Sequence, residues 1–193
     1  MTAAMTQEFT KQPVEVEEAR PEGAAEVPQI EIVLKVENSK ESDLRKNLIL
    51  RPATNEDTEF ARIAHHEAYR DVIERQFGSF DETAQDEFFF NSWSDSAGFQ
   101  IINWAGQSAG YTHVEETSEY IYGHELVLFP DYQNKGIGSF LLNSWQENAK
   151  SKNIPLKLQV LKENKAKELY ERAGFIGTSQ TDTHYEMEWS PNS

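Results

Sequence analysis

The chain has 193 residues, enough for one domain with a core, and its 33 acidic residues outnumber its 18 basic residues to give a net charge of −15. A chain this acidic is not expected to bind nucleic acid or an anionic membrane, because both require a basic surface. Because it has no cysteine, it can form neither a disulfide nor a thiolate metal site nor a cysteinyl intermediate.

Residues 1–46 are predicted to be an acidic, mostly disordered N-terminal extension. They are rich in Glu, Ala and Pro and poor in large apolar side chains, so they cannot bury enough surface to offset the entropy of ordering. Only Ile30–Val36 alternates like a strand, and we expect it to stay loose. The sequence shows neither a signal peptide nor an apolar run that would span a bilayer, so a cytoplasmic location is expected.

Residues 47–193 are predicted to form one mixed α/β domain, because alternating and helical apolar patterns follow one another along them. Thr54 and Asp57 have the spacing of a capping box, and Gly78 breaks the helix that follows. The expected elements, in chain order, are strand Leu48–Pro52, helices ending near Gln76 and covering about Asp81–Trp93, strands Phe99–Trp104, Ala109–Glu115 and Tyr120–Phe129, a helix from Ile137 to about Lys150, strand Leu156–Val160, a helix over residues 164–173, and strands Phe175–Thr178 and His184–Trp189.

A glycine-rich turn, Gln133-Asn134-Lys135-Gly136-Ile137-Gly138, joins a strand to a helix. The free N–H groups of a helix N-terminus attract an anion, and glycine lets a ligand approach the backbone closely. Lys135 adds positive charge there. A Rossmann fingerprint would need glycine in place of Leu141, and a P-loop would need Gly-Lys-Ser/Thr after a longer spacing, so neither motif fits.

A second motif runs from Asn164 to Phe175. Asn164 is a plausible N-cap, and Gly174 is a plausible helix stop. One face of the helix between them carries Ala166, Leu169, Tyr170 and Ala173. Taken together, the turn (Q-x-x-G-x-G) and this segment (N-x-A-x-x-L-Y-x-x-x-G-F) resemble motifs A and B of the GNAT superfamily, the GCN5-related N-acetyltransferases. The alternative is that Tyr170 is only a core aromatic.

The resemblance covers about residues 47–190 and implies the GNAT acyl-CoA N-acyltransferase fold, with the order β-α-α-β-β-β-α-β-α-β-β. It implies an enzyme that moves the acetyl group of its co-substrate acetyl-CoA, without a metal, to a primary amine of a small acceptor in a ternary complex. A protein N-terminal or lysine acetyltransferase and a non-catalytic acyl-CoA-binding module are the alternatives. The acceptor is unassigned in the bacterial group that the chain resembles, and a homodimer is one candidate assembly.

The resemblance also implies roles for individual residues. In this superfamily two central parallel strands splay apart and admit the pantetheine arm, so the Leu126 N–H would polarise the thioester carbonyl, a contact that can contribute about 3 kcal/mol. Tyr170 would protonate the departing thiolate as general acid. The other cofactor-binding residues would be Val127, Leu128, Gln133, Asn134, Lys135, Gly136, Ile137, Gly138, Ser139, Asn164 and Lys167.

The acceptor amine must lose a proton before it attacks, so a base is needed. His124 is the first candidate, because it lies two residues before Leu126 and is expected to share its face of the strand. Tyr122, Glu125 and a water relay are alternatives. The adjacent His65-His66 are not expected to bind a metal together, because neighbouring residues of a helix point in different directions.

Charge is unevenly distributed along the chain. Residues 131–172 carry eight Lys or Arg and five acids, a net of about +3 that suits a phosphate-rich cofactor. Residues 55–95, the helices that wall the acceptor pocket in the superfamily, carry eleven acids and three bases, a net of −8. We therefore expect a cationic acceptor, contacted by Glu74 and by His184 on the closing hairpin. The alternative is an acidic surface kept for solubility.

Overall fold

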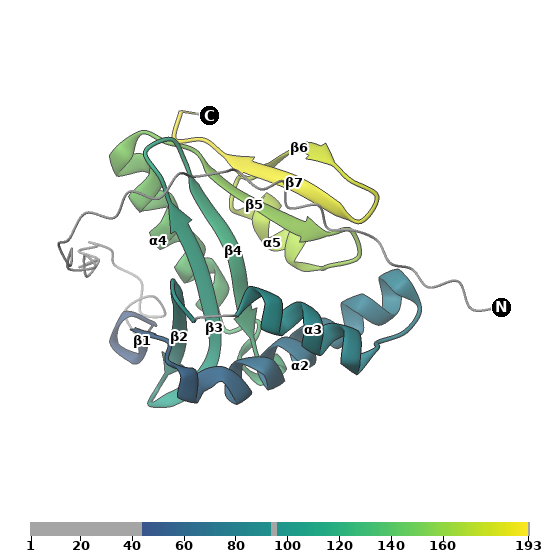
Figure 1. The fold of residues 1–193 in the computed structure, drawn as a ribbon. Helices are drawn as coiled ribbons and strands as arrows, with labels where there is room; N and C mark the ends of the chain where they lie inside the picture. The colour runs from purple at the N-terminus through teal and green to yellow at the C-terminus, as the bar shows by residue number, and fades with distance from the viewer. Residues whose placement is uncertain (1–43, 94–95, 193) are drawn as a thin grey trace, which may run out of the picture. The chain divides into compact units, whose positions relative to one another are not determined.

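The computed structural model describes residues 44–93 and 96–192, which form a seven-stranded sheet with helices on both faces (Figure 1). Its strand order is β1-β2-β3-β4-β5-β7-β6, and β4 and β5 form its parallel pair. The strands are β1 (Leu48–Pro52), β2 (Phe99–Trp104), β3 (Gln107–Glu116), β4 (Ile121–Leu128), β5 (Leu156–Leu161), β6 (Ile176–Gln180) and β7 (His184–Trp189). The helices are α2 (Thr58–Phe77), α3 (Glu82–Ser92), α4 (Ile137–Lys152) and α5 (Ala166–Arg172), with short 3-10 turns η1 (Asn55–Asp57) and η2 (Pro130–Tyr132).

The predicted mixed α/β fold and element order are confirmed, and most element ends fall within a few residues of the expected positions. The capping box is present: the Thr54 N–H donates to the Asp57 carboxylate at 2.8 Å. Two hydrogen bonds from Arg51 to the same carboxylate lower the pKa of Asp57 to about 2 and tie β1 to the start of α2. None of the described helices is long and apolar enough to cross a bilayer.

The start of the ordered core differs from the prediction. Leu44, placed by sequence in the extension, is buried against Ile102, Leu128 and Leu141. A lone leucine at the edge of a polar segment carries no periodic signal, so the pattern could not assign it to the core. Ile30–Val36 and the rest of the predicted extension before residue 44 lie outside the described residues.

One face of the sheet is covered by α2 and α3, which cross β2–β4 in Figure 1. Small residues on α2, Ala61 and Ala64, let the helix approach the sheet closely, and both are completely buried. Aromatic rings fill the rest of this layer, with the Trp93 and Phe99 ring centres 4.4 Å apart. The buried cluster comprises Ala61, Ala64, Phe89, Trp93, Phe99, Ile101, Tyr111 and Val127.

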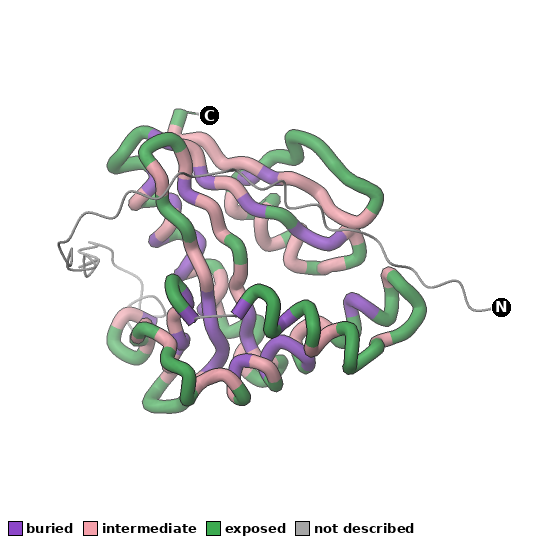
Figure 2. The backbone as a smooth tube through the Cα atoms, in the orientation of Figure 1, coloured by how far each residue is buried: buried purple, intermediate pink, exposed green. Residues whose placement is uncertain are grey.

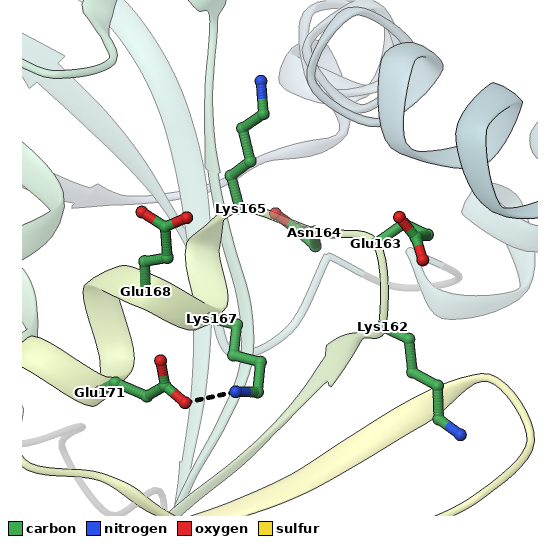
Figure 3. Close-up of a pocket in the computed structure, with 7 residues that line it drawn as sticks. All are labelled: Lys162, Glu163, Asn164, Lys165, Lys167, Glu168 and Glu171. Atoms are coloured by element: carbon green, nitrogen blue, oxygen red, sulfur yellow. Dashed lines mark hydrogen bonds and ion pairs between the residues drawn. The ribbon is translucent and has the colours of Figure 1, made fainter.

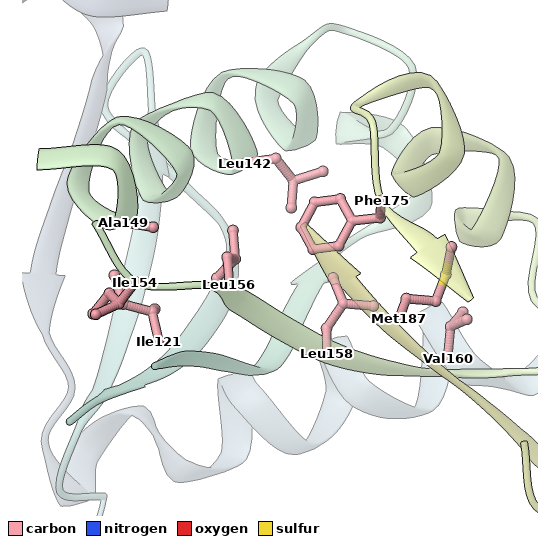
Figure 4. Packing of buried hydrophobic residues seen from close by; sticks show 9 residues of the cluster. All are labelled: Ile121, Leu142, Ala149, Ile154, Leu156, Leu158, Val160, Phe175 and Met187. Carbon is pink, nitrogen blue, oxygen red and sulfur yellow. The ribbon is translucent and has the colours of Figure 1, made fainter. Parts of the chain in front are cut away.

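The other face is covered by α4 and α5. Figure 4 shows Leu142 of α4 and Phe175, which follows α5, directed at Leu158 on β5. A fully buried apolar side chain of this size stabilises a fold by about 1.5–3 kcal/mol. Figure 2 shows that burial is concentrated in the central strands and the helix faces against them, while β6 at the sheet edge is exposed along its whole length.

The two central parallel strands separate after a short contact. Their ladder contains three pairs and ends where Gly123 lies opposite Leu158. Beyond this point Gln159–Leu161 of β5 pair with β7, and the rest of β4 pairs with β3. The sheet therefore splays between β4 and β5, as the resemblance to GNAT proteins implied.

The C-terminal end of α2 joins two loops beside the splay, the loop after β5 and the loop before β7. The Gln76 side chain accepts from the Glu163 N–H at 3.1 Å and donates to the Thr183 carbonyl at 3.0 Å. Arg75 donates to the Glu163 carbonyl at 2.8 Å. Since Glu163 follows β5 and Thr183 precedes β7, one helix end fixes two loops at once.

We predict that Gln76→Ala lowers the free energy of unfolding by about 1 kcal/mol, because it removes two hydrogen bonds to partly exposed backbone groups. Urea unfolding followed by circular dichroism would measure the change. Glu67→Ala, at an exposed position of the same helix, is the control and should change stability by less than about 0.5 kcal/mol. Equal effects of the two substitutions would show that the bridge contributes nothing specific.

Candidate active site

The backbone of β4 turns alternate N–H groups toward the splay. Phe129 donates its N–H to the Ala109 carbonyl at 3.0 Å, and the Val127 carbonyl oxygen would lie 2.0 Å from a Cβ placed on Gly110, so both residues face β3. Backbone direction alternates along a strand, and the N–H groups of Leu126 and Leu128 consequently face away from β3. They lie beyond the last β4–β5 pair and face the open side of the splay.

This alternation sets Val127 apart from Leu126 and Leu128, and cofactor binding by any of the three stays a prediction. Val127 was expected to bind the cofactor, but its carbonyl lies against Gly110, and its side chain is buried with Tyr111 under α2 and α3. Its backbone thus belongs to the β3–β4 ladder. Neighbouring residues of a strand cannot both turn their backbone groups to the same side, and the predicted run from 126 to 128 overlooked this.

The glycine-rich turn has the geometry of an anion site. Gly136 adopts a left-handed conformation with φ 92° and immediately precedes α4, whose first N–H groups are left without helical partners. Asn134 is also left-handed, with φ 58°. The Gln133 side chain donates to the Leu128 carbonyl at 3.0 Å and so fixes the turn to the end of β4. The Lys135 ammonium lies 5.2 Å from the centre of the Tyr132 ring.

The second glycine of the turn serves helix packing. A Cβ on Gly138 would lie 3.3 Å from a methyl carbon of Leu169, so α4 and α5 meet closely at this position. That contact brings the turn and the helix carrying Tyr170 together. Motifs A and B, thirty residues apart in sequence, therefore share one packing contact.

A mixed-charge pocket lies beside the loop that leads from β5 into α5 (Figure 3). The Asn164 side-chain oxygen accepts from the Ala166 N–H at 2.9 Å, which satisfies a free donor at the start of α5. Lys167 pairs with Glu171 and lies 5.0 Å from the ring centre of Tyr185. Cofactor binding by Asn164 or Lys167 would exchange these contacts and stays a prediction. The pocket is lined by Lys162, Glu163, Asn164, Lys165, Lys167, Glu168 and Glu171.

Tyr170 projects from α5, which ends as predicted: Gly174 is left-handed with φ 87°, and the Phe175 N–H donates to the Tyr170 carbonyl at 3.0 Å. Burial, with a smaller contribution from the charge of Glu125, raises the pKa of Tyr170 to about 12. Within the described part of the chain its hydroxyl makes no hydrogen bond. The hydroxyl consequently keeps its proton at neutral pH, and among the described residues it donates this proton to no acceptor.

Glu125 has a pKa that suits a base at neutral pH. Burial raises its pKa to about 7, and a 3.1 Å hydrogen bond from the Tyr69 hydroxyl partly opposes that rise. A group with this pKa is divided between its acid and carboxylate forms near pH 7, which suits proton transfer.

A β-bulge at His124 explains why Glu125 turns inward. In the β3–β4 ladder Val114 lies opposite Gly123 and His113 lies opposite Glu125, so His124 is the extra residue. The expectation that His124 shares a face with Leu126 is therefore wrong, because a bulge breaks strict alternation. His124 is exposed instead, stacks on His113 with 4.7 Å between ring centres, and bonds Glu115 at 3.0 Å.

The adjacent histidines of α2 point into different surroundings, as predicted. The His65 ring packs 4.7 Å from Tyr69, and burial lowers the pKa of His65 to about 4. His66 lies 3.1 Å from the Asp86 carboxylate. Among the residues that the structure describes, no group of three or more His, Asp or Glu is arranged to hold a metal.

The two residues predicted to contact the acceptor occupy different positions. His184 lies opposite Leu161 at the α2 end of the splay, and burial lowers its pKa. Glu74 is exposed on α2, whereas the adjacent Ile73 packs against Leu161. Contact of either residue with the acceptor stays a prediction.

Sequence reasoning missed Tyr69 and ranked Glu125 below His124. The available signal was the position of Tyr69 four residues after His65, on the buried face of α2. A glutamate directly before the apolar run of residues 126–129 was a second signal, because a carboxylate in such a position is either paired or shifted in pKa.

The chain matches the family model described as an acetyltransferase (GNAT) domain over residues 61–190. No curated protein sequence matches it.

Several solved structures share the fold. PaiA N-acetyltransferase from Thermoplasma acidophilum, in complex with coenzyme A, has a TM-score of 0.62 at 19% identity, covering 74% of this chain and 98% of that one. PH1933 from Pyrococcus horikoshii OT3 has a TM-score of 0.58 at 18% identity, covering 74% and 98%. The ribosomal-protein-S18-alanine N-acetyltransferase from Escherichia coli has a TM-score of 0.53 at 18% identity, covering 74% and 93%.

The raised pKa of Glu125 predicts a pH-dependent stability difference. The folded state holds this proton up to about pH 7, while an unfolded glutamate releases it near 4.5, so the wild type loses stability as pH rises between these values. Glu125→Gln removes the ionisation. We expect the variant to melt at a higher temperature than the wild type at pH 8 and at the same temperature below pH 4.5.

Calorimetry at both pH values would test this expectation. The control is Glu119→Gln at an exposed turn position, which should follow the wild type throughout. A Glu125→Gln variant that is less stable than the wild type at pH 8 would contradict the assigned burial.

Proposed function

The chain belongs to the GNAT acetyltransferase family, and from the arrangement of its site we propose that it transfers the acetyl group of acetyl-CoA to a primary amine of a small, cationic acceptor. The proposal is carried by the splay, where the N–H groups of Leu126 and Leu128 face away from β3 and the preceding Glu125 has a pKa raised to about 7. The charge of Glu125 also acts on Tyr170. In this proposal the backbone donors, Glu125 as base and Tyr170 as acid serve one reaction at the splay.

Coenzyme A binding is supported by the turn and by a structural neighbour. The first N–H groups of α4 and the exposed Lys135 would hold the pyrophosphate, and the Leu126 and Leu128 N–H groups would bond the thioester and pantetheine oxygens. The PaiA N-acetyltransferase from Thermoplasma acidophilum, which shares this fold, is in complex with coenzyme A.

In the proposed reaction, the acceptor amine attacks the thioester carbon and forms a C–N bond. Glu125 takes the proton that the nitrogen releases, as general base in place of His124. The Leu126 N–H stabilises the oxyanion of the tetrahedral intermediate. The C–S bond then breaks, and Tyr170 gives its proton to the thiolate of coenzyme A. Transfer is direct, because the chain has no cysteine to carry the acetyl group.

A cationic acceptor is supported by the charges of α2 and α3. Their arginines are engaged in ion pairs, Arg62 with Asp86 at 3.0 Å and Arg70 with Glu82 at 3.0 Å, and Arg75 with Asp71. Glu67 and Glu87 are exposed on the same helices. Because the bases are already paired, the field at this surface is negative and favours an amine with more than one positive charge.

We predict that Gly136→Asp weakens coenzyme A binding by roughly tenfold or more, because a carboxylate would face the pyrophosphate at short range. Isothermal titration calorimetry would measure the dissociation constant. Gly136→Ala introduces the same left-handed strain without the charge and should weaken binding much less. If coenzyme A neither binds nor raises the melting temperature of the wild type, the proposed co-substrate is wrong.

We predict that acetyl-CoA is turned over with a small polyamine or another polycationic amine in a panel that also contains amino acids and peptides.

With the best acceptor, Glu125→Gln and Tyr170→Phe should each lower kcat by roughly 100-fold, as expected when a general base or acid is removed. His124→Ala should stay within about threefold of the wild type. A large loss in His124→Ala with none in Glu125→Gln would reverse the assignment, and turnover of peptides alone would redirect it to protein substrates.

A further inference from the structure

Tyr69 connects the helix on the acceptor side to the carboxylate at the splay. It lies in the middle of α2 and donates its hydroxyl hydrogen to Oε2 of Glu125 at 3.1 Å. Burial, together with the charge of Glu125, raises the pKa of Tyr69 well above its usual value. The phenol therefore keeps its proton at neutral pH and acts as the donor in this contact.

The Tyr69 ring is held on its own helix by His65. The two residues lie four apart on one face of α2, with ring centres 4.7 Å apart. His65 is only 2% exposed and stays neutral above about pH 4, so this packing does not change over the pH range in which Glu125 titrates. Phe89 of α3 packs on the same imidazole at 5.8 Å.

We propose that Tyr69 is a positioning residue: its hydroxyl occupies Oε2 of Glu125 and leaves Oε1 directed at the acceptor amine, so that α2 sets the orientation of the base. The inference rests on the proposed function, in which Glu125 takes the proton from the amine. The terminal torsion of a glutamate is broad, so a carboxylate without such a contact would sample many orientations. Proton transfer is efficient only when the accepting oxygen lies within hydrogen-bond reach of the nitrogen.

Other titratable groups surround Glu125 without making this contact. Tyr111 on β3 and Tyr170 on α5 both sense its charge, and His113 lies opposite it in the ladder. For Tyr111, burial is the main cause of a raised pKa, and no hydrogen bond to Glu125 contributes. Tyr111→Phe is thus a matched control: it removes the same atom from a buried ring near the same carboxylate.

The test compares Tyr69→Phe with Tyr111→Phe in two measurements. Carbon-13 NMR of glutamate-labelled protein, with the Glu125 signal assigned from Glu125→Gln, reports the titration of Glu125 without any substrate. The pH dependence of kcat/KM reports the catalytic base. Tyr69→Phe should move both midpoints upward by about one pH unit, because a hydrogen bond to the charged form is lost. The KM for acetyl-CoA should be unchanged, and Tyr111→Phe should move neither midpoint.

Glu125→Asp provides a second test that does not depend on how well Tyr69→Phe folds. The shorter side chain withdraws the carboxylate from the Tyr69 hydroxyl but keeps its acidity. In this background Tyr69→Phe should have little further effect on the acidic limb of kcat/KM, so the two substitutions should be strongly non-additive. Additive effects would overturn the proposal.

The measurements separate this inference from the proposed function. If the Glu125 signal titrates identically in Tyr69→Phe and the wild type, Tyr69 does not position the carboxylate, even if the enzyme is active. A second outcome is that the Glu125 signal shifts in Tyr69→Phe, but the midpoint of the acidic limb of wild-type kcat/KM differs from the midpoint of the Glu125 titration. The contact then exists, but Glu125 is not the base. The positioning role of Tyr69 in catalysis is overturned together with that assignment.

Discussion

The rest of the structure depends on the early end of the β4–β5 ladder at Gly123. A strand interior normally pairs every backbone group, since an unpaired buried donor costs about 1–3 kcal/mol. Here the Leu126 and Leu128 N–H groups face an opening, and the bulge at His124 occurs at the same point of β4. Bulges bend a strand and increase its twist. The local irregularity and the divergence of the two strands are therefore one feature of the backbone.

Different contacts fix the elements on the two sides of the splay. On the α4 side, the Gln133 side chain fixes the glycine turn to Leu128, and the small Gly138 lets α4 meet α5. On the other side, α2 contacts β4 through Tyr69 and the loops beyond β5 through Gln76. A helix joined to both halves of a divergent sheet limits how far they can separate.

Under the proposed function, the chemistry is divided between two side chains. Burial raises the pKa of both Glu125 and Tyr170, but from ordinary values so different that one reaches about 7 and the other about 12. At neutral pH the carboxyl group can accept a proton and the phenol can donate one. Two groups whose titrations are separated in this way are suited to opposite roles in one reaction.

The sequence predicted the parts of the structure that local pattern determines. Gly136 and Gly174 occupy left-handed positions where a tight turn and a helix end require them, and Thr54 and Asp57 form the expected cap. The bulge at His124 could not be predicted, because it depends on register against β3. Because the sequence prediction lacked this bulge, it placed His124 on the same face as Leu126 and ranked Glu125 below His124 as the candidate base. The backbone direction of Val127 and the contact made by Tyr69 could not be predicted for a related reason: strand pairing and helix packing are contacts between distant parts of the chain.

The position of Tyr69 gives α2 two roles under the proposed function. Its exposed face carries carboxylates such as Glu67, and its buried face carries the hydroxyl that bonds Glu125. The cofactor, in contrast, would be held by β4, the glycine turn and α4. An acceptor that displaced α2 would therefore disturb the base before it reached the thioester, while one that fitted against α2 would find the carboxylate already oriented. Selection of the amine and orientation of the base then depend on the same helix, and neither requires movement of the cofactor side.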